Sequence, residues 1–121
     1  MNILLIGDVV AQSGVEFLQK KLGELKNKYK ADITVVNGEN SADGNGITKL
    51  SARGIISAGA DVITTGNHCF QRNDCGEVFE NEYIIRPANY PEGNAGEGFC
   101  ILDILYLIIC IGAVIQLIRL L

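Results

Sequence analysis

Short apolar runs alternate with amphipathic stretches along the first half of the chain. The runs at 2–7, 32–37 and 61–65 are mainly hydrophobic, which is typical of strands buried on both faces. Between the first two runs, apolar residues recur every three or four positions over 14–29, which is the pattern of an amphipathic helix. An order of strand, helix, strand, helix, strand predicts right-handed crossovers and a parallel sheet, and therefore a protein of the α/β class.

Local signals predict where the helices begin and end. Ser13 has the spacing of a capping box with the glutamate three residues later, so it is expected to cap the first helix. Thr48 is expected to cap a second helix that ends at Gly59, because glycine tolerates the left-handed conformation that follows many helices. Residues 71–82 are expected to hold a further helix, and 83–85 a short extended piece.

The chain changes character after Phe99. Residues 104–121 contain only two polar side chains, and 104–115 contain no charge. A membrane span needs about 20 apolar residues, whereas an element buried in a core is usually shorter and bounded by turn signals. Three interpretations therefore stay open for this segment: a membrane-associating or membrane-spanning helix, a frame-shifted or degenerate tail, and an ordinary element of the core.

The composition narrows the classes of function. A chain of 121 residues suits one modest domain, and a net charge of −4 with scattered basic residues gives no footprint for nucleic-acid binding. The chain opens on an apolar strand without a basic segment or cleavage site, so no signal peptide is expected. Reduced thiols in the cytoplasm are expected, because the cysteines fit neither a zinc spacing nor a paired disulfide framework; they are Cys69, Cys75, Cys100 and Cys110.

Polar side chains follow each of the three predicted strands. Asp8 follows the first strand, Glu39 and Asn40 follow the second, and Asn67 and His68 follow the third. Ligands gather beyond the carboxyl ends of parallel strands, so these side chains are expected to converge there. Carboxylate and amide oxygens are hard ligands that suit Mn²⁺, Mg²⁺ or Fe, and an imidazole adds either a further ligand or an acid.

Each of these residues also has an ordinary structural interpretation. Asp8 alone could cap a helix, and Asn40, Asp43 and Asn45 could be turn formers that tolerate a positive φ. His68 alone could be a loop histidine with a satisfied hydrogen bond. Their joint occurrence at three successive strand ends favours a functional site. The glycine-rich stretch that follows Asp43 matches neither a dinucleotide-binding fingerprint nor a Walker loop.

Four stretches of the chain resemble the YmdB-like family, a branch of the calcineurin-like metallophosphoesterases described as 2′,3′-cyclic-nucleotide 2′-phosphodiesterases. They are IGDVV at 6–10, NGENSADGNGIT at 37–48, GADVITTGNH at 59–68 and RPANYPEG at 86–93. The resemblance covers roughly residues 1–99. It implies that 1–99 is the N-terminal half of a metallophosphoesterase domain, an α/β sandwich, and that 100–121 is a divergent hydrophobic tail.

The resemblance also implies a dinuclear site with two divalent ions, Fe, Mn or Mg. In it Asp8 would bind one ion, Glu39 would bridge both, Asn40 would support the first ion, and Asn67 would bind the second. His68 would act as the general acid that protonates the leaving oxygen, and it would not be a metal ligand.

The chain departs from the family pattern in its second part. Members of the family are longer, and their further ligands are histidines from the second half, whereas this chain has no histidine after His68. The expected function is therefore a metal-dependent phosphodiesterase that hydrolyses 2′,3′-cyclic nucleotides or related phosphodiesters, with a site that is incomplete in this chain. The alternative is an inactive truncated or degenerate copy, associated with a membrane through 104–121. The expected partner is a small phosphodiester, and a homo-oligomer stays open.

Overall fold

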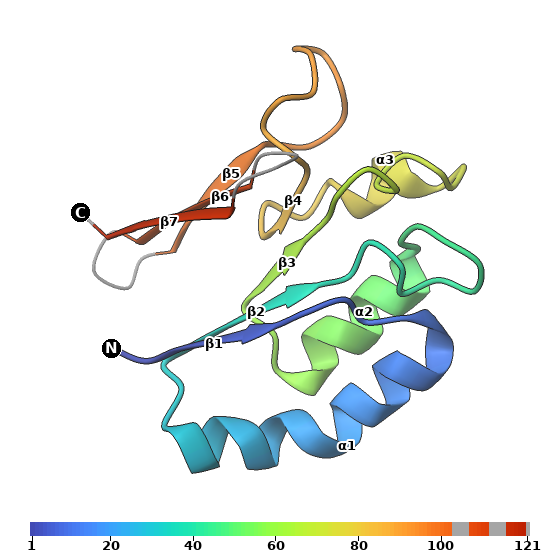
Figure 1. Cartoon of the computed structure of the whole chain (residues 1–121). Coiled ribbons are helices and arrows are strands. Elements are labelled where there is room, and N and C mark those ends of the chain that lie inside the picture. The colour runs from blue at the N-terminus through green and yellow to red at the C-terminus, as the bar shows by residue number, and fades with distance from the viewer. Residues whose placement is uncertain (103–106, 112–115, 121) are drawn as a thin grey trace.

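The computed structural model of the protein describes residues 1–102, 107–111 and 116–120 (Figure 1). Three helices and four parallel strands form its first part, and three antiparallel strands follow. The elements are β1 (Ile3–Ile6), α1 (Ala11–Tyr29), β2 (Ile33–Asn37), α2 (Lys49–Ala58), β3 (Val62–Thr64), α3 (Cys75–Val78), β4 (Ile84–Ile85), β5 (Phe99–Leu102), β6 (Leu107–Ile111) and β7 (Gln116–Leu120).

The first four strands form a parallel sheet in the order β1-β2-β3-β4, which confirms the predicted α/β class. Helices α1 and α2 cover one face of this sheet (Figure 1). They bury a single apolar core whose members come from both helices and from β2 and β3, among them Val15, Leu22, Val36, Ile55 and Ile63. Burying side chains of this size removes them from water at a gain of about 1.5–3 kcal/mol each, so packing fixes the helices on the sheet.

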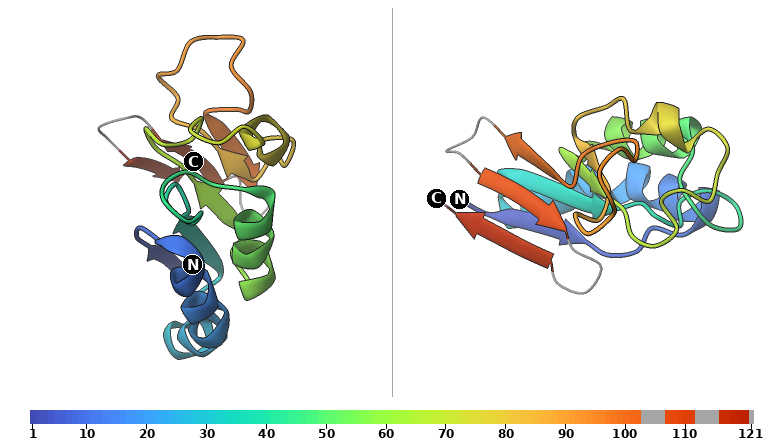
Figure 2. Two further views of the ribbon diagram at one scale, coloured as in Figure 1. Left: turned by 90° about the vertical axis from the view of Figure 1, so that its right-hand side faces the viewer. Right: turned by 90° about the horizontal axis from the view of Figure 1, so that it is seen from above.

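The opposite face of the parallel sheet is covered by the second sheet, in the order β5-β6-β7 (Figure 2). Along β5 the side chains alternate, with Cys100 and Leu102 buried and Phe99 and Ile101 exposed. The buried pair packs against the side chains of the parallel sheet that point away from the helices: Ile33, Val35, Val62 and Ile85. The fold is thus layered, with helices, a parallel sheet and an antiparallel sheet.

The helix considered for 104–121 differs from the structure, which has strands β6 and β7 at 107–111 and 116–120. Both pair antiparallel with their neighbours, β5 with β6 and β6 with β7. A short apolar run fits a strand as well as a buried helix, so its periodicity alone did not separate the two. In the described ranges no helix combines the length and apolar character needed to cross a membrane.

Helix α2 begins and ends as predicted. The Thr48 hydroxyl accepts a hydrogen bond from the Ser51 backbone N–H at 3.2 Å, and the Ser51 side chain accepts from the Thr48 N–H in return. Gly59 has a φ of 108° and closes the helix by donating to the carbonyl groups of its last turn. Both capping residues directly flank the helix in the sequence, so the ends of the helix could be predicted from the sequence alone.

Helix α1 begins earlier than predicted, and Ser13 does not cap it. The helix starts at Ala11, and its first residues donate backbone N–H groups to the loop after β2 instead. The Ala11 N–H donates to the Asn40 carbonyl at 2.9 Å, and the Gln12 N–H donates to Asp43 Oδ1 at 3.4 Å. The unpaired N–H groups of a helix start are therefore satisfied from a distant segment, so the local serine is not needed.

The helix expected over 71–82 is present only as the single turn α3, and the extended piece expected over 83–85 is present as β4. No side chain caps α3 at Asp74, and Gly76 lies within it, which lowers the helix propensity of the segment. Val78 and Phe79 are buried and fix this turn on the core.

Candidate functional site

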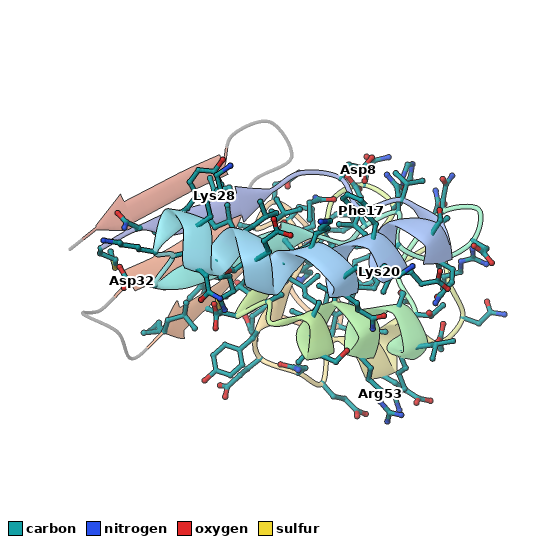
Figure 3. All side chains as sticks on the ribbon, turned by 90° about the horizontal axis from the view of Figure 1, so that it is seen from below. Asp8, Phe17, Lys20, Lys28, Asp32 and Arg53 are labelled. Atoms are coloured by element: carbon teal, nitrogen blue, oxygen red, sulfur yellow. The ribbon has the colours of Figure 1, made fainter. Side chains whose placement is uncertain are left out.

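The loops that leave β1, β2 and β3 meet at the carboxyl edge of the parallel sheet. Two backbone hydrogen bonds continue the sheet pairing into these loops, from the Val9 N–H to the Asn37 carbonyl at 3.0 Å and from the Gly38 N–H to the Thr64 carbonyl at 2.9 Å. Figure 3 shows Asp8 at the end of the sheet where α1 begins and Asp32 at the opposite end. The predicted convergence of the three strand ends is therefore present in the fold.

Asn40 joins the loops after β1 and β3. Its side-chain Nδ2 donates to Asp8 at 2.9 Å from Oδ1 and 3.1 Å from Oδ2, and its Oδ1 lies 2.6 Å from His68 Nδ1. An ionised carboxylate only accepts hydrogen bonds, so the side facing Asp8 must be the amide nitrogen. The orientation of the Asn40 amide follows from its partners, and three predicted site residues form one hydrogen-bonded array.

The same array fixes the tautomer of His68. An amide oxygen only accepts, so His68 Nδ1 must carry the hydrogen that it donates to Asn40 Oδ1. The other ring nitrogen, Nε2, is then the atom that can take up and release a proton. The His68 side chain is 26% exposed, which leaves it accessible to a small substrate.

Glu39 lies against the loop after β3. Its Oε2 accepts from the His68 backbone N–H at 3.3 Å and is 4.0 Å from His68 Nδ1, so it forms an ion pair when the imidazole is protonated. A Cβ placed at Gly66 would come within 2.6 Å of Glu39 Cδ, so a larger residue here would displace the carboxylate from its present position.

Asn67 is exposed, and its side chain makes no hydrogen bond with the part of the chain that the structure describes. The structure thus brings four of the five predicted residues into direct contact and places Asn67 beside them through the backbone. Across the described ranges no group of three or more His, Cys, Asp or Glu side chains is arranged to hold a metal ion. The assignment of the five residues as ligands and acid remains a prediction.

Cys69, next to His68, is a packing residue. Its side chain is fully buried, and burial raises the pKa of the thiol above its ordinary value. A hydrogen bond with Cys69 raises the pKa of the Tyr90 hydroxyl in turn, and the Tyr90 ring meets Phe70 edge-on at 5.1 Å. A thiol held in its neutral form is a weak nucleophile, and the buried position of Cys69 is that of a residue that packs beneath the loop.

A model of the YmdB-like protein family matches residues 4–117, which is nearly the whole chain. The chain belongs to the YmdB-like family. The 2′,3′-cyclic-nucleotide 2′-phosphodiesterase of Bacillus subtilis is 41% identical to it over 99 residues, which cover 81% of this chain and 38% of the relative. Named relatives of this YmdB-like chain are thus hydrolases of phosphoesters.

Two crystal structures share the fold of the YmdB-like chain. A hypothetical protein from Thermus thermophilus superposes with a TM-score of 0.80 at 35% identity, over 89% of this chain and 42% of the other. A novel phosphatase from Mycoplasma pneumoniae superposes with a TM-score of 0.78 at 31% identity, over 88% of this chain and 40% of the other. The chain therefore spans about two fifths of the length of the relatives that it matches.

The oxygen atoms that this YmdB-like site offers are of the type that binds divalent metal ions. Asp8 and Glu39 offer carboxylates, and the amide oxygen of Asn40 has a second lone pair beside the one that accepts from His68. In number these donors fall short of two complete coordination spheres, since no group of three or more His, Cys, Asp or Glu side chains in the described part of the chain is arranged to hold a metal ion. These residues therefore match only part of the ligand set that a dinuclear metal centre needs.

One residue of this YmdB-like site was not found from the sequence. Arg72, four positions after His68, contacts the glycine-rich loop that begins at Asn40. The signal that could have indicated it is the alternation of glycine with polar residues over 43–46, which marks a backbone that another group approaches closely.

Proposed function

We propose that this chain supplies the first half of a metal-dependent phosphodiesterase site that acts on 2′,3′-cyclic nucleotides or related phosphodiesters. The observation that supports it is the hydrogen-bonded array of Asp8, Asn40 and His68, with Glu39 at 4.0 Å from the imidazole. The name of the Bacillus subtilis relative supports the substrate class.

In the proposed mechanism, Asp8, Glu39, Asn40 and Asn67 would hold two divalent ions (Fe, Mn or Mg) on this side. Such ions, when bound, activate a water molecule and neutralise the charge of the phosphoryl group. Asn40 accepts from His68 Nδ1 and so aims the imidazole, leaving Nε2 to hold a proton. His68 delivers that proton to the departing ribose oxygen as the general acid.

The remaining ligands of the proposed site come from residues outside this chain's described part. The chain spans 38% of its Bacillus subtilis relative, and its one imidazole, His68, is assigned here to proton transfer. Further ligands would be supplied by more polypeptide of the same protein or by a second chain. Metal binding by this chain alone is accordingly expected to be weak.

The metal half of the proposal is tested by titrating the purified chain with Mn²⁺ and measuring free ion by electron paramagnetic resonance. Asp8→Asn is expected to abolish the binding seen with the wild-type chain. Asp32→Asn removes another exposed carboxylate, at the opposite end of the sheet, so it is expected to leave Mn²⁺ binding unchanged (Figure 3). Equal losses in both variants would contradict a site at Asp8.

The catalytic half is tested by incubating the chain with Mn²⁺ and 2′,3′-cyclic AMP and measuring nucleoside monophosphate. Slow turnover that His68→Ala removes is the expected result. Turnover no higher than that of His68→Ala would favour the alternative of an inactive copy for this chain by itself.

A further inference from the structure

The loop 40–46 leads from Asn40 away from the sheet and turns back toward α2. Gly44 and Gly46 have φ values of 92° and 88°, in the left-handed region that favours glycine. The Ala42 N–H donates to the Gly46 carbonyl at 3.0 Å and closes the turn. In this conformation the backbone carbonyls of Asp43 and Asn45 can accept hydrogen bonds from another segment of the chain.

The Arg72 guanidinium occupies that position. Its Nε donates to the Asn45 carbonyl at 2.6 Å, and its Nη2 donates to the Asp43 carbonyl. A Cβ at Gly46 would lie 2.9 Å from Arg72 Cγ, so the stem of the arginine packs on the glycine backbone itself. Two hydrogen bonds from one rigid planar group define the position of the loop more closely than a single flexible donor would.

Arg72 belongs to the segment that also carries His68. The Gln71 N–H donates to the His68 carbonyl at 3.2 Å, and the Cys75 N–H donates to the Arg72 carbonyl at 3.2 Å, so the segment is a continuous series of turns. Arg72 makes no ion pair with a carboxylate of the described residues. Its hydrogen bonds therefore serve to tie the loop after β2 to the loop after β3.

The other side of the loop is tied to α1. The Asn40 carbonyl accepts from the Ala11 N–H at 2.9 Å, and Asp43 Oδ1 accepts from the Gln12 N–H at 3.4 Å. Asn40, whose side chain joins Asp8 and His68, is thus the first residue of a loop that is held between Arg72 and the start of the helix.

We propose that Arg72 is a positioning residue, which holds loop 40–46 so that the Asn40 side chain joins Asp8 to His68. It acts through Asn40 and touches neither metal nor substrate. The expected effect of Arg72 on metal binding rests on the proposed function. Its expected effect on the position of the Asn40 side chain does not depend on any metal.

The first test observes the Asn40 side-chain amide by ¹⁵N nuclear magnetic resonance in the full chain without metal. Arg72→Gln is expected to move or broaden the two amide proton signals of Asn40, because the Asp8 contact is loosened. Arg72→Lys keeps the stem, the charge and one donor, and is expected to restore part of the wild-type spectrum. Arg53→Gln is the matched control, since Arg53 is exposed on α2 and away from the loop (Figure 3). Asn40 signals unchanged in Arg72→Gln would overturn the proposal.

The second test measures Mn²⁺ affinity in a double-mutant cycle with Asn40→Ala. Arg72→Gln is expected to weaken binding about tenfold, which is within the range for loss of a supporting hydrogen bond around a metal site. In the Asn40→Ala background the same change is expected to have no further effect. Equal losses in both backgrounds would show that Arg72 does not act through Asn40. A wild-type chain that binds no Mn²⁺ would count against the proposed function, and the resonance test would still decide the role of Arg72.

Discussion

At the scale of single residues, the site depends on short polar side chains with defined donor and acceptor ends. Asn40 can join Asp8 and His68 only because its amide has a donor on one side and an acceptor on the other. Aspartate at position 40 would place two carboxylates face to face, and like charges in contact repel. The donor and the acceptor of the Asn40 amide are therefore more important for this array than the size of the side chain.

Gly66 is a residue whose replacement tests the position of Glu39. Gly66→Ala is expected to displace the Glu39 carboxylate and to lower the free energy of unfolding by about 1 kcal/mol, because the added Cβ breaks the hydrogen bond that Glu39 accepts from the His68 N–H. Gly76→Ala is the matched control, since a Cβ there meets nothing within 4 Å and alanine favours helix. Denaturant unfolding of both variants checks this, and equal stabilities would show that Glu39 does not lie over Gly66.

At the scale of elements, the sequence was informative where the determinants of a structure lie close together in the chain. Strands β1, β2 and β3 follow from apolar runs, and α2 follows from Thr48 and Gly59, which directly flank the helix. The start of α1 could not be found in this way, because its N–H groups are satisfied by Asn40 and Asp43, about thirty residues on. The contact of Arg72 with the loop could not be predicted from the sequence for the same reason, because its partners Asp43 and Asn45 are distant in the chain.

The caps of the two helices provide a test of this distinction. Thr48→Ala is expected to lower the free energy of unfolding by about 1 kcal/mol, because it removes the acceptor for the Ser51 N–H. Ser13→Ala is expected to change it by less than about 0.5 kcal/mol, since Ser13 lies exposed within α1 and caps nothing. If Ser13→Ala lowered the free energy of unfolding as much as Thr48→Ala, the result would show that Ser13 caps α1, as predicted from the sequence.

The junction of β5 with the parallel sheet gives the stability a pH dependence. Burial raises the pKa of the Cys100 thiol to about 11, from 9.0. Between these values the unfolded chain binds fewer protons than the folded one, so the free energy of unfolding is expected to fall as the pH rises from about 9 to 11. The contribution of this thiol is fully present below about pH 9.

Cys100→Ala is expected to make that alkaline decline shallower in denaturant unfolding at several pH values. Cys75→Ala, in α3, is expected to keep the decline of the wild-type chain. A decline that is the same in all three proteins would mean that Cys100 is not buried against the sheet.

At the scale of the whole molecule, the layered fold places the candidate site at the carboxyl edge of the parallel sheet. The parallel sheet is covered on one side by α1 and α2 and on the other by β5–β7, and its carboxyl edge carries the Asp8, Asn40 and His68 array (Figure 1). Fold class and the five candidate residues could be predicted because strand ends and polar residues coincide in the sequence. The hydrogen bonds within that set could not, because they depend on how loops that are distant in the sequence meet.

The central claim is that this chain holds the N-terminal half of a working phosphodiesterase site. The most direct measurement is hydrolysis of 2′,3′-cyclic AMP by a chimera in which residues 1–99 replace the matching part of the Bacillus subtilis relative. We expect Mn²⁺-dependent turnover that His68→Ala reduces at least about a hundredfold, as for loss of a general acid. A folded chimera that binds Mn²⁺ but hydrolyses no faster than its His68→Ala variant would contradict the claim.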